Sequence, residues 1–318
     1  MAIFTSELSH YSLEKGSMVM GIGRDNIVKI KTDSRGRMIP NDLEKQLDLT
    51  ISKGIVPILV NSTMGTTVFG ANDPLNEIAE ICEKRNIWLH IDACYGGSQL
   101  FLDDFRKQRE FGLLKADSIA VDQHKVLNIP QQSTIFLTKH KNLMEACNST
   151  NAAYLFMKDK VLYDSSLDTG DRSIQCSRHI DIAKLWLYWR SLSTEGIQLM
   201  VKYALENARY LSELVKEHPN FELICEPEYL TVSFFYYPDC LLGQSKDDEF
   251  WQRVHKLAPI IKAEMIKRGN IMLAYQKQDS SYRKLVNFFR PSITLGKEKE
   301  DMEFIVNEIH AIGKDIVI

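Results

Sequence analysis

Ile-Trp-Leu-His-Ile-Asp (residues 87–92) and Ser-Ile-Ala-Val-Asp-Gln-His-Lys (residues 118–125) are the two stretches that decide the fold of this chain. Each begins as a short apolar run, which is typical of a buried β-strand, and each ends in polar side chains. Residues 102–114, which lie between them, have the apolar spacing of a helix. Short apolar strands separated by helices predict a mainly parallel sheet covered on both faces. We therefore expect an α/β fold.

The same alternation of strand and helix patterns extends in both directions from these stretches. Strands are predicted at residues 2–5, 27–31, 55–60 and 134–137, and helices at residues 9–20, 40–53 and from Pro74 onward. The chain opens in the middle of this pattern, and no glycine-rich loop is placed to hold a phosphate at a helix N-terminus. We therefore expect the large sheet domain to be N-terminally incomplete.

The second half of the chain has a different order of elements. Helices are predicted at residues 180–189, 195–217, 251–267 and 301–312, and strands at residues 221–225, 231–237, 271–275 and 285–289. The helix at residues 195–217 is long enough to link two domains. We place a boundary near Thr194, which predicts a large domain at residues 1–194 and a small α/β domain at residues 195–318.

The composition limits the classes of function. Among 318 residues, 25% are charged and 44% are hydrophobic, which is ordinary for a globular protein. The net charge of −3 provides no basic field for nucleic acid or anionic lipid. No apolar run approaches the ~20 residues of a membrane helix. The six cysteines are far apart in the sequence, which favours reduced thiols and a cytoplasmic location.

Lys125 and Asp92 are the residues that point to a specific chemistry. Asp92 ends one predicted strand, and the pair His124-Lys125 follows the next. A lysine amine can form a Schiff base with pyridoxal 5'-phosphate, and a carboxylate can keep the ring nitrogen of that cofactor protonated. The two positions therefore indicate pyridoxal phosphate chemistry.

Further motifs follow in a fixed order along the chain. They are Ser-Glu-Leu-Ser-His-Tyr-Ser (6–12), Tyr-Leu-Phe (154–156), Asp-Thr-Gly-Asp (168–171), Gln-Cys-Ser-Arg-His (175–179) and Val-Asn-Phe-Phe-Arg (286–290). Together with residues 87–92 and 118–125, this set resembles the group II pyridoxal-phosphate decarboxylases over essentially the whole chain. The acidic-substrate branch, which comprises the glutamate, cysteine sulfinate and aspartate 1-decarboxylases, is the most similar.

The resemblance implies a fold-type I architecture, with a large cofactor domain, a small C-terminal domain and a homodimer whose sites lie at the interface. It also implies that family members have a further stretch before the point where this chain starts. In the family that stretch supplies a Ser/Gly phosphate cup and part of the substrate pocket.

The resemblance also implies roles for five residues around the cofactor. Lys125 would form the Schiff base, Asp92 would pair with the ring nitrogen, and His10 would stack on the ring. Thr63 would border the ring substituents, and His124 would lie near the phosphate and the substrate carboxylate. Lys125, Asp92, His10 and the turn after Thr63 each have a plain structural alternative: a surface lysine, a turn aspartate, an exposed histidine in a first helical turn, and a β-turn.

Two further residues would act on the substrate. Tyr154 matches a tyrosine that returns a proton to the substrate carbon after decarboxylation, and the alternative is a buried tyrosine packing beside Leu155. Arg290 matches an arginine that binds a substrate carboxylate, where planar bidentate contact favours arginine over lysine. Its alternative is a surface arginine at a strand end.

We therefore expect a carboxy-lyase that decarboxylates an acidic amino acid through a Lys125 Schiff base and a quinonoid intermediate. Cysteine sulfinate and aspartate are the first candidate substrates, and glutamate is a third. One rival hypothesis is a truncated, catalytically impaired homologue that acts only as a binding or dimerising module. A weaker rival is a metal hydrolase that uses His90, Asp92 and Cys94, although the sequence provides no evident fourth ligand.

Asp122 departs from the family pattern. Relatives commonly have asparagine at this position, and they commonly have proline where this chain has Gln123. If Asp122 faces the cofactor phosphate, two anions meet, which costs roughly 4 kcal/mol at ~4 Å near a protein surface. Asp122 must then turn away, be protonated, or weaken cofactor binding.

Overall fold

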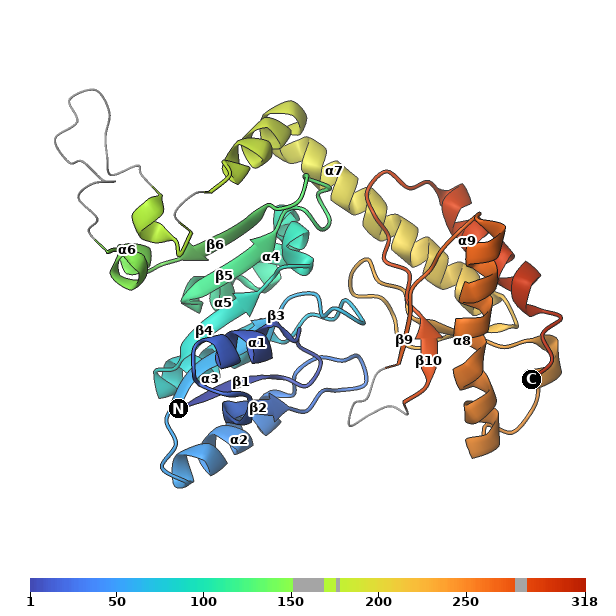
Figure 1. The fold of residues 1–318 in the computed structure, drawn as a ribbon, viewed down its shortest axis with the longest axis horizontal. Helices are drawn as coiled ribbons and strands as arrows, with labels where there is room; N and C mark the ends of the chain where they lie inside the picture. The colour runs from blue at the N-terminus through green and yellow to red at the C-terminus, as the bar shows by residue number, and fades with distance from the viewer. Residues whose placement is uncertain (151–168, 176–177, 278–284) are drawn as a thin grey trace.

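The computed structural model describes residues 1–150, 169–175, 178–277 and 285–318. Its first half is built on a six-stranded sheet with the order β2-β1-β3-β4-β5-β6. The strands are β1 (Ala2–Ser6), β2 (Ile27–Ile30), β3 (Pro57–Thr63), β4 (Trp88–Asp92), β5 (Ser118–Asp122) and β6 (Thr134–Thr138). The first five run parallel, and β6 pairs antiparallel with β5. The expected α/β fold with a mainly parallel sheet is confirmed (Figure 1).

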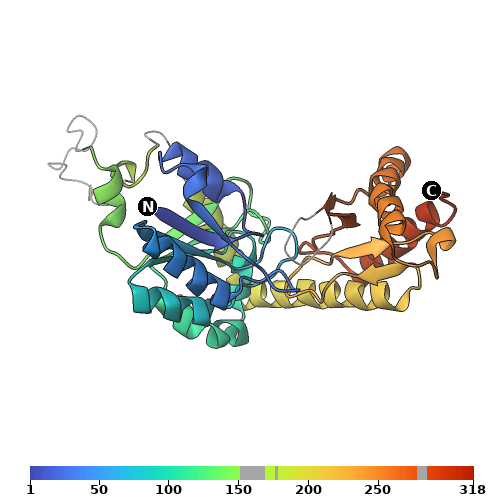
Figure 2. The same cartoon turned by 90° about the horizontal axis from the view of Figure 1, so that it is seen from below.

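Helices cover this sheet on both faces. Figure 2 shows α1 (Ser12–Val19) on the opposite face from α2 (Pro40–Ser52) and α3 (Leu75–Arg85). Leucine and isoleucine spacing along α2 and α3 gives each helix one apolar stripe, which packs on the strands. The stripe and the strands share one buried cluster that includes Leu43, Leu47, Ile78, Phe4, Val60, Leu89 and Ile91.

The expected single helix at residues 102–114 is wrong, because the chain forms two short helices there. They are α4 (Asp103–Gln108) and α5 (Glu110–Lys115), and Arg109 between them has φ −118° and ψ 11°. The Asn76 side chain on α3 donates to the Gln108 carbonyl at 2.8 Å and accepts from the Gly112 amide at 3.0 Å. These bonds satisfy a carbonyl and an amide that the break leaves without partners in a helix. A side chain from another helix thereby stabilises the interruption.

The helix α7 (Asp181–Glu217) leads to a second sheet, as Figure 2 shows. Ser193 interrupts it with φ 59° and ψ 174°, next to the boundary expected near Thr194. The second sheet has the antiparallel order β7-β8-β10-β9, with β7 (Phe221–Leu223), β8 (Phe234–Tyr236), β9 (Tyr275–Lys277) and β10 (Asn287–Phe289). The helices α8 (Asp248–Arg268) and α9 (Lys299–Gly313) complete this half.

The strand expected at residues 271–275 is largely wrong. The strand β9 begins at Tyr275, and the preceding residues contribute one backbone hydrogen bond to its neighbour, from the Arg290 amide to the Ala274 carbonyl at 3.0 Å. Ile271 and Met272 instead line a pocket beside α9. Apolar β-branched composition therefore marked a pocket wall rather than a ladder strand.

The main buried clusters of the two halves are separate, but a smaller cluster joins Leu8, Val68, Phe69 and Ala71 to Phe288. The loop after Lys125 belongs to the main cluster of the second half. Val126, Leu127 and Ile129 pack with residues of α7, α8 and α9. The segment that follows β5 is thereby fixed against the second half of the molecule. The division into domains at residues 1–194 and 195–318 stays a prediction. No helix in the described part of the chain has both the length and the apolar character to cross a bilayer.

Candidate active site

The parallel strands of the large sheet end at one edge, and the predicted site residues His10, Thr63, Asp92, His124 and Lys125 lie there. The register pairs Thr63, at the end of β3, with Asp92, and it pairs Asp92 with Ala120 of β5. His10 lies in the turn that follows β1, and Lys125 lies in the turn that follows β5. Because the carboxyl ends of parallel strands meet at one edge, four distant parts of the sequence come together.

Lys125 is held by an ion pair with Asp122. The Lys125 Nζ lies 2.9 Å from Asp122 Oδ2, and the two side chains are 39% and 12% exposed. Thr134 Oγ1 on β6 donates to Asp122 Oδ1 at 2.6 Å. Burial alone would raise the pKa of the Asp122 carboxyl, but hydrogen bonds from Thr134 and Lys125 bring it below its ordinary value. Hydrogen bonding from Thr134 and the ion pair with Lys125 therefore favour the ionised form of this carboxyl.

His124 is fixed by the backbone of the strand next to it. Its Nδ1 lies 2.9 Å from the Ser133 carbonyl oxygen and 3.1 Å from the Ser133 amide nitrogen, so its tautomer decides which contact is the hydrogen bond. Its Nε2 lies 4.0 Å from Asp122 Oδ2. His124 therefore faces the carboxylate that already pairs with Lys125.

Asp92 and His10 lie in the same electrostatic environment as Lys125. Burial and then the charge of Lys125 lower the pKa of His10. Asp92 and Asp122 act in the opposite direction on the same imidazole. Asp92 Oδ1 accepts a hydrogen bond from the Cys94 amide at 3.1 Å, and within the described residues this carboxylate has no ion pair. An amine, a carboxylate and an imidazole thus share one site.

Asp73 fixes the end of β3 at this site. The fully buried carboxylate accepts from the Thr63 amide and the Met38 amide, both at 2.7 Å. These bonds hold Thr63 beside Asp92 in the register of the sheet. Burial raises the pKa of the Asp73 carboxyl to about 7, in spite of the two amide donors.

Asp73 therefore makes the stability of the fold depend on pH. In the unfolded chain its pKa is near 4, so between about pH 4 and pH 7 the unfolded state has released a proton that the folded state keeps. As the pH rises from about 4 to about 7, we expect this group to lower the free energy of unfolding by about 1.4 kcal/mol for each pH unit. Urea unfolding of the protein and of Asp73→Asn at several pH values measures this effect. The variant lacks the titrating carboxyl, so the difference between the two free energies of unfolding isolates the contribution of Asp73. Parallel curves for the two proteins would contradict this assignment.

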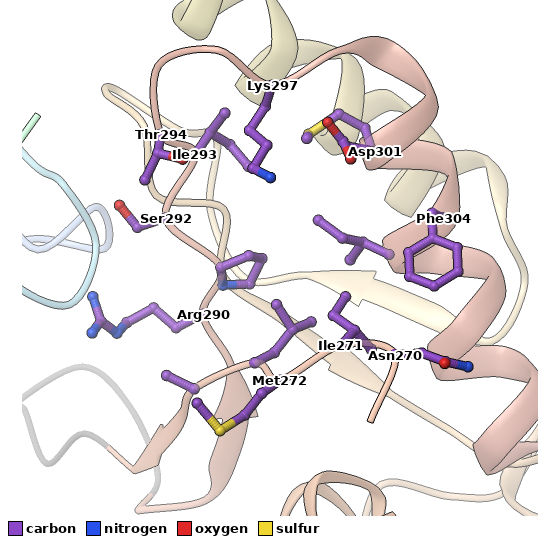
Figure 3. Close-up of a pocket in the computed structure, with 15 residues that line it drawn as sticks. Asn270, Ile271, Met272, Arg290, Ser292, Ile293, Thr294, Lys297, Asp301 and Phe304 are labelled. Carbon is purple, nitrogen blue, oxygen red and sulfur yellow. The ribbon is translucent and has the colours of Figure 1, made fainter. Parts of the chain in front are cut away.

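Arg290 lies just after β10 and reaches toward the large sheet. Its guanidinium donates to the Thr67 carbonyl, and its Nε is buried without a hydrogen-bond partner. Burial lowers the pKa of this arginine. Arg290 also contributes to the wall of a pocket of about 440 Å³, but Figure 3 shows its guanidinium pointing away from that pocket. The group faces the segment that holds Thr67, and its buried Nε is a donor without an acceptor.

Tyr95 is a site residue that sequence reasoning did not single out for a role. Its hydroxyl lies 2.9 Å from Thr231 Oγ1 and 2.5 Å from Ser292 Oγ, so it connects the two halves of the molecule. Burial raises the pKa of the phenol, and the charges of Arg290 and Lys125 act against that rise. Tyr95 therefore lies within the fields of both cations. Its partners are far away in the sequence, so no local pattern could have identified it.

One other predicted site residue lies outside the described structure, and the predicted metal site has no structural support. Tyr154 lies outside the described residues. His90, which was considered as a metal ligand with Asp92 and Cys94, has its Nδ1 2.8 Å from Ser118 Oγ. Within residues 1–150, 169–175, 178–277 and 285–318, no three histidine, cysteine, aspartate or glutamate side chains are grouped to hold a metal ion. The structure gives the metal-hydrolase hypothesis no support.

Comparison with known proteins identifies the family. Residues 1–237 match the pyridoxal-dependent decarboxylase conserved domain. The chain belongs to the pyridoxal-dependent decarboxylase family. The family resemblance drawn from the ordered sequence motifs is thereby confirmed.

Similar proteins include members of the acidic-substrate branch of this family. Acidic amino acid decarboxylase GADL1 of Bos taurus is 45% identical over 318 residues, which are 99% of this chain and 60% of that protein. Human cysteine sulfinic acid decarboxylase is 40% identical, over 99% of this chain and 63% of its own length. The crystal structure of mouse CSAD has a TM-score of 0.91 at 39% identity and matches 99% of this chain and 64% of its own. The chain thus spans about 60% of the length of these curated relatives.

Proposed function

We propose that this chain binds pyridoxal 5'-phosphate and decarboxylates a small acidic amino acid. The observation that supports this most strongly is the convergence of Lys125, Asp92 and His10 at one edge of a parallel sheet. Relatives that share 40–45% of the sequence are named as decarboxylases of acidic amino acids or of cysteine sulfinic acid. Cysteine sulfinate and aspartate are the first candidate substrates, and glutamate is the third.

The side chains present fit the cofactor in their chemistry. Lys125 supplies an amine that is partly open to solvent, and Asp92 supplies a carboxylate without an ion pair in the described structure. We propose that Lys125 holds the aldehyde carbon, that Asp92 holds the ring nitrogen, and that His10 covers a ring face. Thr63 and His124 complete the cofactor contacts in this proposal. When bound, the cofactor supplies a ring that accepts the electron pair left on the substrate carbon.

The remaining steps of the proposed reaction are assigned to individual residues of the chain. Asp92 keeps a proton on the ring nitrogen, because a carboxylate stabilises the cationic form. Arg290 binds a carboxylate of the substrate through its buried guanidinium, whose Nε lacks a partner. Tyr154 donates a proton to the substrate carbon after carbon dioxide has left, and Lys125 receives and releases the amine groups. The positive charge of Arg290 favours a substrate with an acidic side chain.

A homodimer is part of the same proposal. The first turns of α7 expose Ile182, Trp186 and Leu187 to 61% each, and Ile180 just before the helix is 76% exposed. An exposed apolar surface of this kind marks an interaction site on most globular proteins. A second copy of the chain would cover it, and sedimentation velocity measures that state. The cytoplasmic location expected from the sequence also stays a proposal, which the free thiols of Cys82 and Cys94 support.

A binding or dimerising module without turnover is the second candidate. The observation that favours it is the ion pair between Lys125 and Asp122, because an amine held in an ion pair must leave it before it can attack an aldehyde. In this case the chain would keep the fold and the exposed face of α7 without releasing carbon dioxide.

Release of carbon dioxide separates the two candidates. The chain is incubated with pyridoxal 5'-phosphate and with carboxyl-labelled cysteine sulfinate, aspartate, glutamate or leucine, with Lys125→Ala as the control. We expect release from at least one acidic amino acid at a rate at least about 100-fold above that with leucine, because leucine has no side-chain acid that could pair with a cation of the site. Absence of release from all three acids, with the chain folded and the cofactor bound, would favour the module instead.

A further inference from the structure

We infer that Asp122 is a positioning residue that holds the Lys125 amine in an ion pair and thereby slows the covalent capture of an aldehyde. This inference rests on the proposed function only in the identity of the aldehyde. It assigns a role to a position where the family commonly has a neutral side chain, and it explains what that departure does at the site.

The geometry of the ion pair supports this role. Asp122 Oδ2 lies 2.9 Å from Lys125 Nζ, while Thr134 Oγ1 holds the other carboxylate oxygen at 2.6 Å. Both oxygens of Asp122 are therefore occupied, and the carboxylate is fixed in its orientation toward the amine. The Asp122 side chain is 12% exposed, so solvent screens this pair less than it screens a surface pair.

Within the described residues, Lys125 forms no ion pair other than the one with Asp122. His124 Nε2 is 4.0 Å from the same Asp122 oxygen, a contact that is charged only if the imidazole is protonated. Asp92 is a second anion that acts on the same His10 imidazole as Asp122 and Lys125. Asp122 is therefore the charged partner that sets the position of the Lys125 amine.

The chemical step shows why the pair slows capture. The ammonium first loses a proton to solvent, and the nitrogen lone pair then adds to the aldehyde carbon. The carbonyl oxygen leaves as water when the carbon–nitrogen double bond forms, so no oxidant or further reactant is needed. The attack also requires Lys125 to leave Asp122, which keeps its bond to Thr134 but loses its cationic partner. Loss of the proton and departure of the amine from the pair are both easier without the carboxylate.

The test measures the acylation rate of Lys125 by a small amine-specific acetylating reagent near pH 7, resolved by peptide mass spectrometry. This reaction needs no cofactor site. We expect Asp122→Asn and Asp122→Ser to raise the rate about fivefold, while Asp122→Glu, which keeps the charge, stays within about twofold of the unmodified chain. Asp181→Asn is the matched control, because Asp181 pairs with Lys184 at the same three-residue spacing and at 2.8 Å. It should leave the labelling of Lys125 unchanged.

A second arm uses aldehydes and separates two ways in which Asp122 could act. Borohydride traps pyridoxal 5'-phosphate or phosphate-free pyridoxal on Lys125 in the same variants. An equal gain with both aldehydes supports a role through the amine, whereas a gain with the phosphorylated aldehyde alone shows repulsion of the phosphate and overturns the inference. Equal acetylation rates in the folded Asp122→Asn, Asp122→Ser and unmodified chains also overturn it. Failure of pyridoxal 5'-phosphate to react at Lys125, with acetylation still accelerated, overturns the proposed function alone.

Discussion

Lys125→Arg is expected to abolish covalent capture of pyridoxal 5'-phosphate and to lower decarboxylation on the order of 10⁴-fold. Arginine keeps a positive charge opposite Asp122, so the ion pair at the end of β5 and the local fold are preserved. A guanidinium stays protonated and is a poor nucleophile toward an aldehyde. Borohydride reduction followed by peptide mass spectrometry measures the capture, and labelled carbon dioxide measures the turnover.

The matched control for this variant is Lys184→Arg. Lys184 pairs with Asp181 at 2.8 Å with the same spacing in the sequence, but it lies at the start of α7. We expect the control to keep both capture and turnover. Retention of the cofactor label at another lysine in Lys125→Arg, together with undiminished turnover, would contradict the role given to Lys125.

Asp92→Asn is expected to separate capture from turnover. The amine of Lys125 is untouched, so the cofactor is still trapped by borohydride at Lys125. Turnover falls on the order of 10²- to 10³-fold, because a neutral amide no longer stabilises the protonated ring nitrogen. Asp92 forms a hydrogen bond with the Cys94 amide at 3.1 Å, and the asparagine oxygen can keep that bond.

The surface acid Asp104 gives the control for this second variant. Asp104 is exposed in the first turn of α4, so Asp104→Asn should change neither capture nor turnover. An Asp92→Asn protein that is folded, captures the cofactor and turns over at an undiminished rate would show that Asp92 does not hold the ring nitrogen.

The parts of the fold that follow from local patterns were predictable. The strands β4 and β5 are short apolar runs bounded by polar residues, and the structure places them at 88–92 and 118–122, close to the expected positions. The break at Arg109 was not predictable, because it depends on hydrogen bonds from Asn76 on another helix. The strand β9 was misplaced because the apolar residues before Tyr275 line a pocket instead of joining the ladder.

The candidate site was likewise predictable only where local sequence patterns determine it. Asp92 and Lys125 could be chosen from the sequence, since the ends of neighbouring parallel strands meet at one edge whatever the detailed packing. Tyr95 could not, because its partners Thr231 and Ser292 come from the other half of the chain. The departure at Asp122 was visible in the sequence. Its ionisation was not, because that depends on Thr134, which the antiparallel strand β6 places opposite it.

The central claim is that Lys125 and Asp92 hold opposite sides of one pyridoxal 5'-phosphate molecule. A crystal structure of the chain with the cofactor tests it most directly. We expect density continuous from the Lys125 Nζ to the cofactor, and an Asp92 carboxylate oxygen about 2.7–2.9 Å from the ring nitrogen. A cofactor bound through another residue, or an Asp92 carboxylate directed away from the ring nitrogen, would contradict the claim.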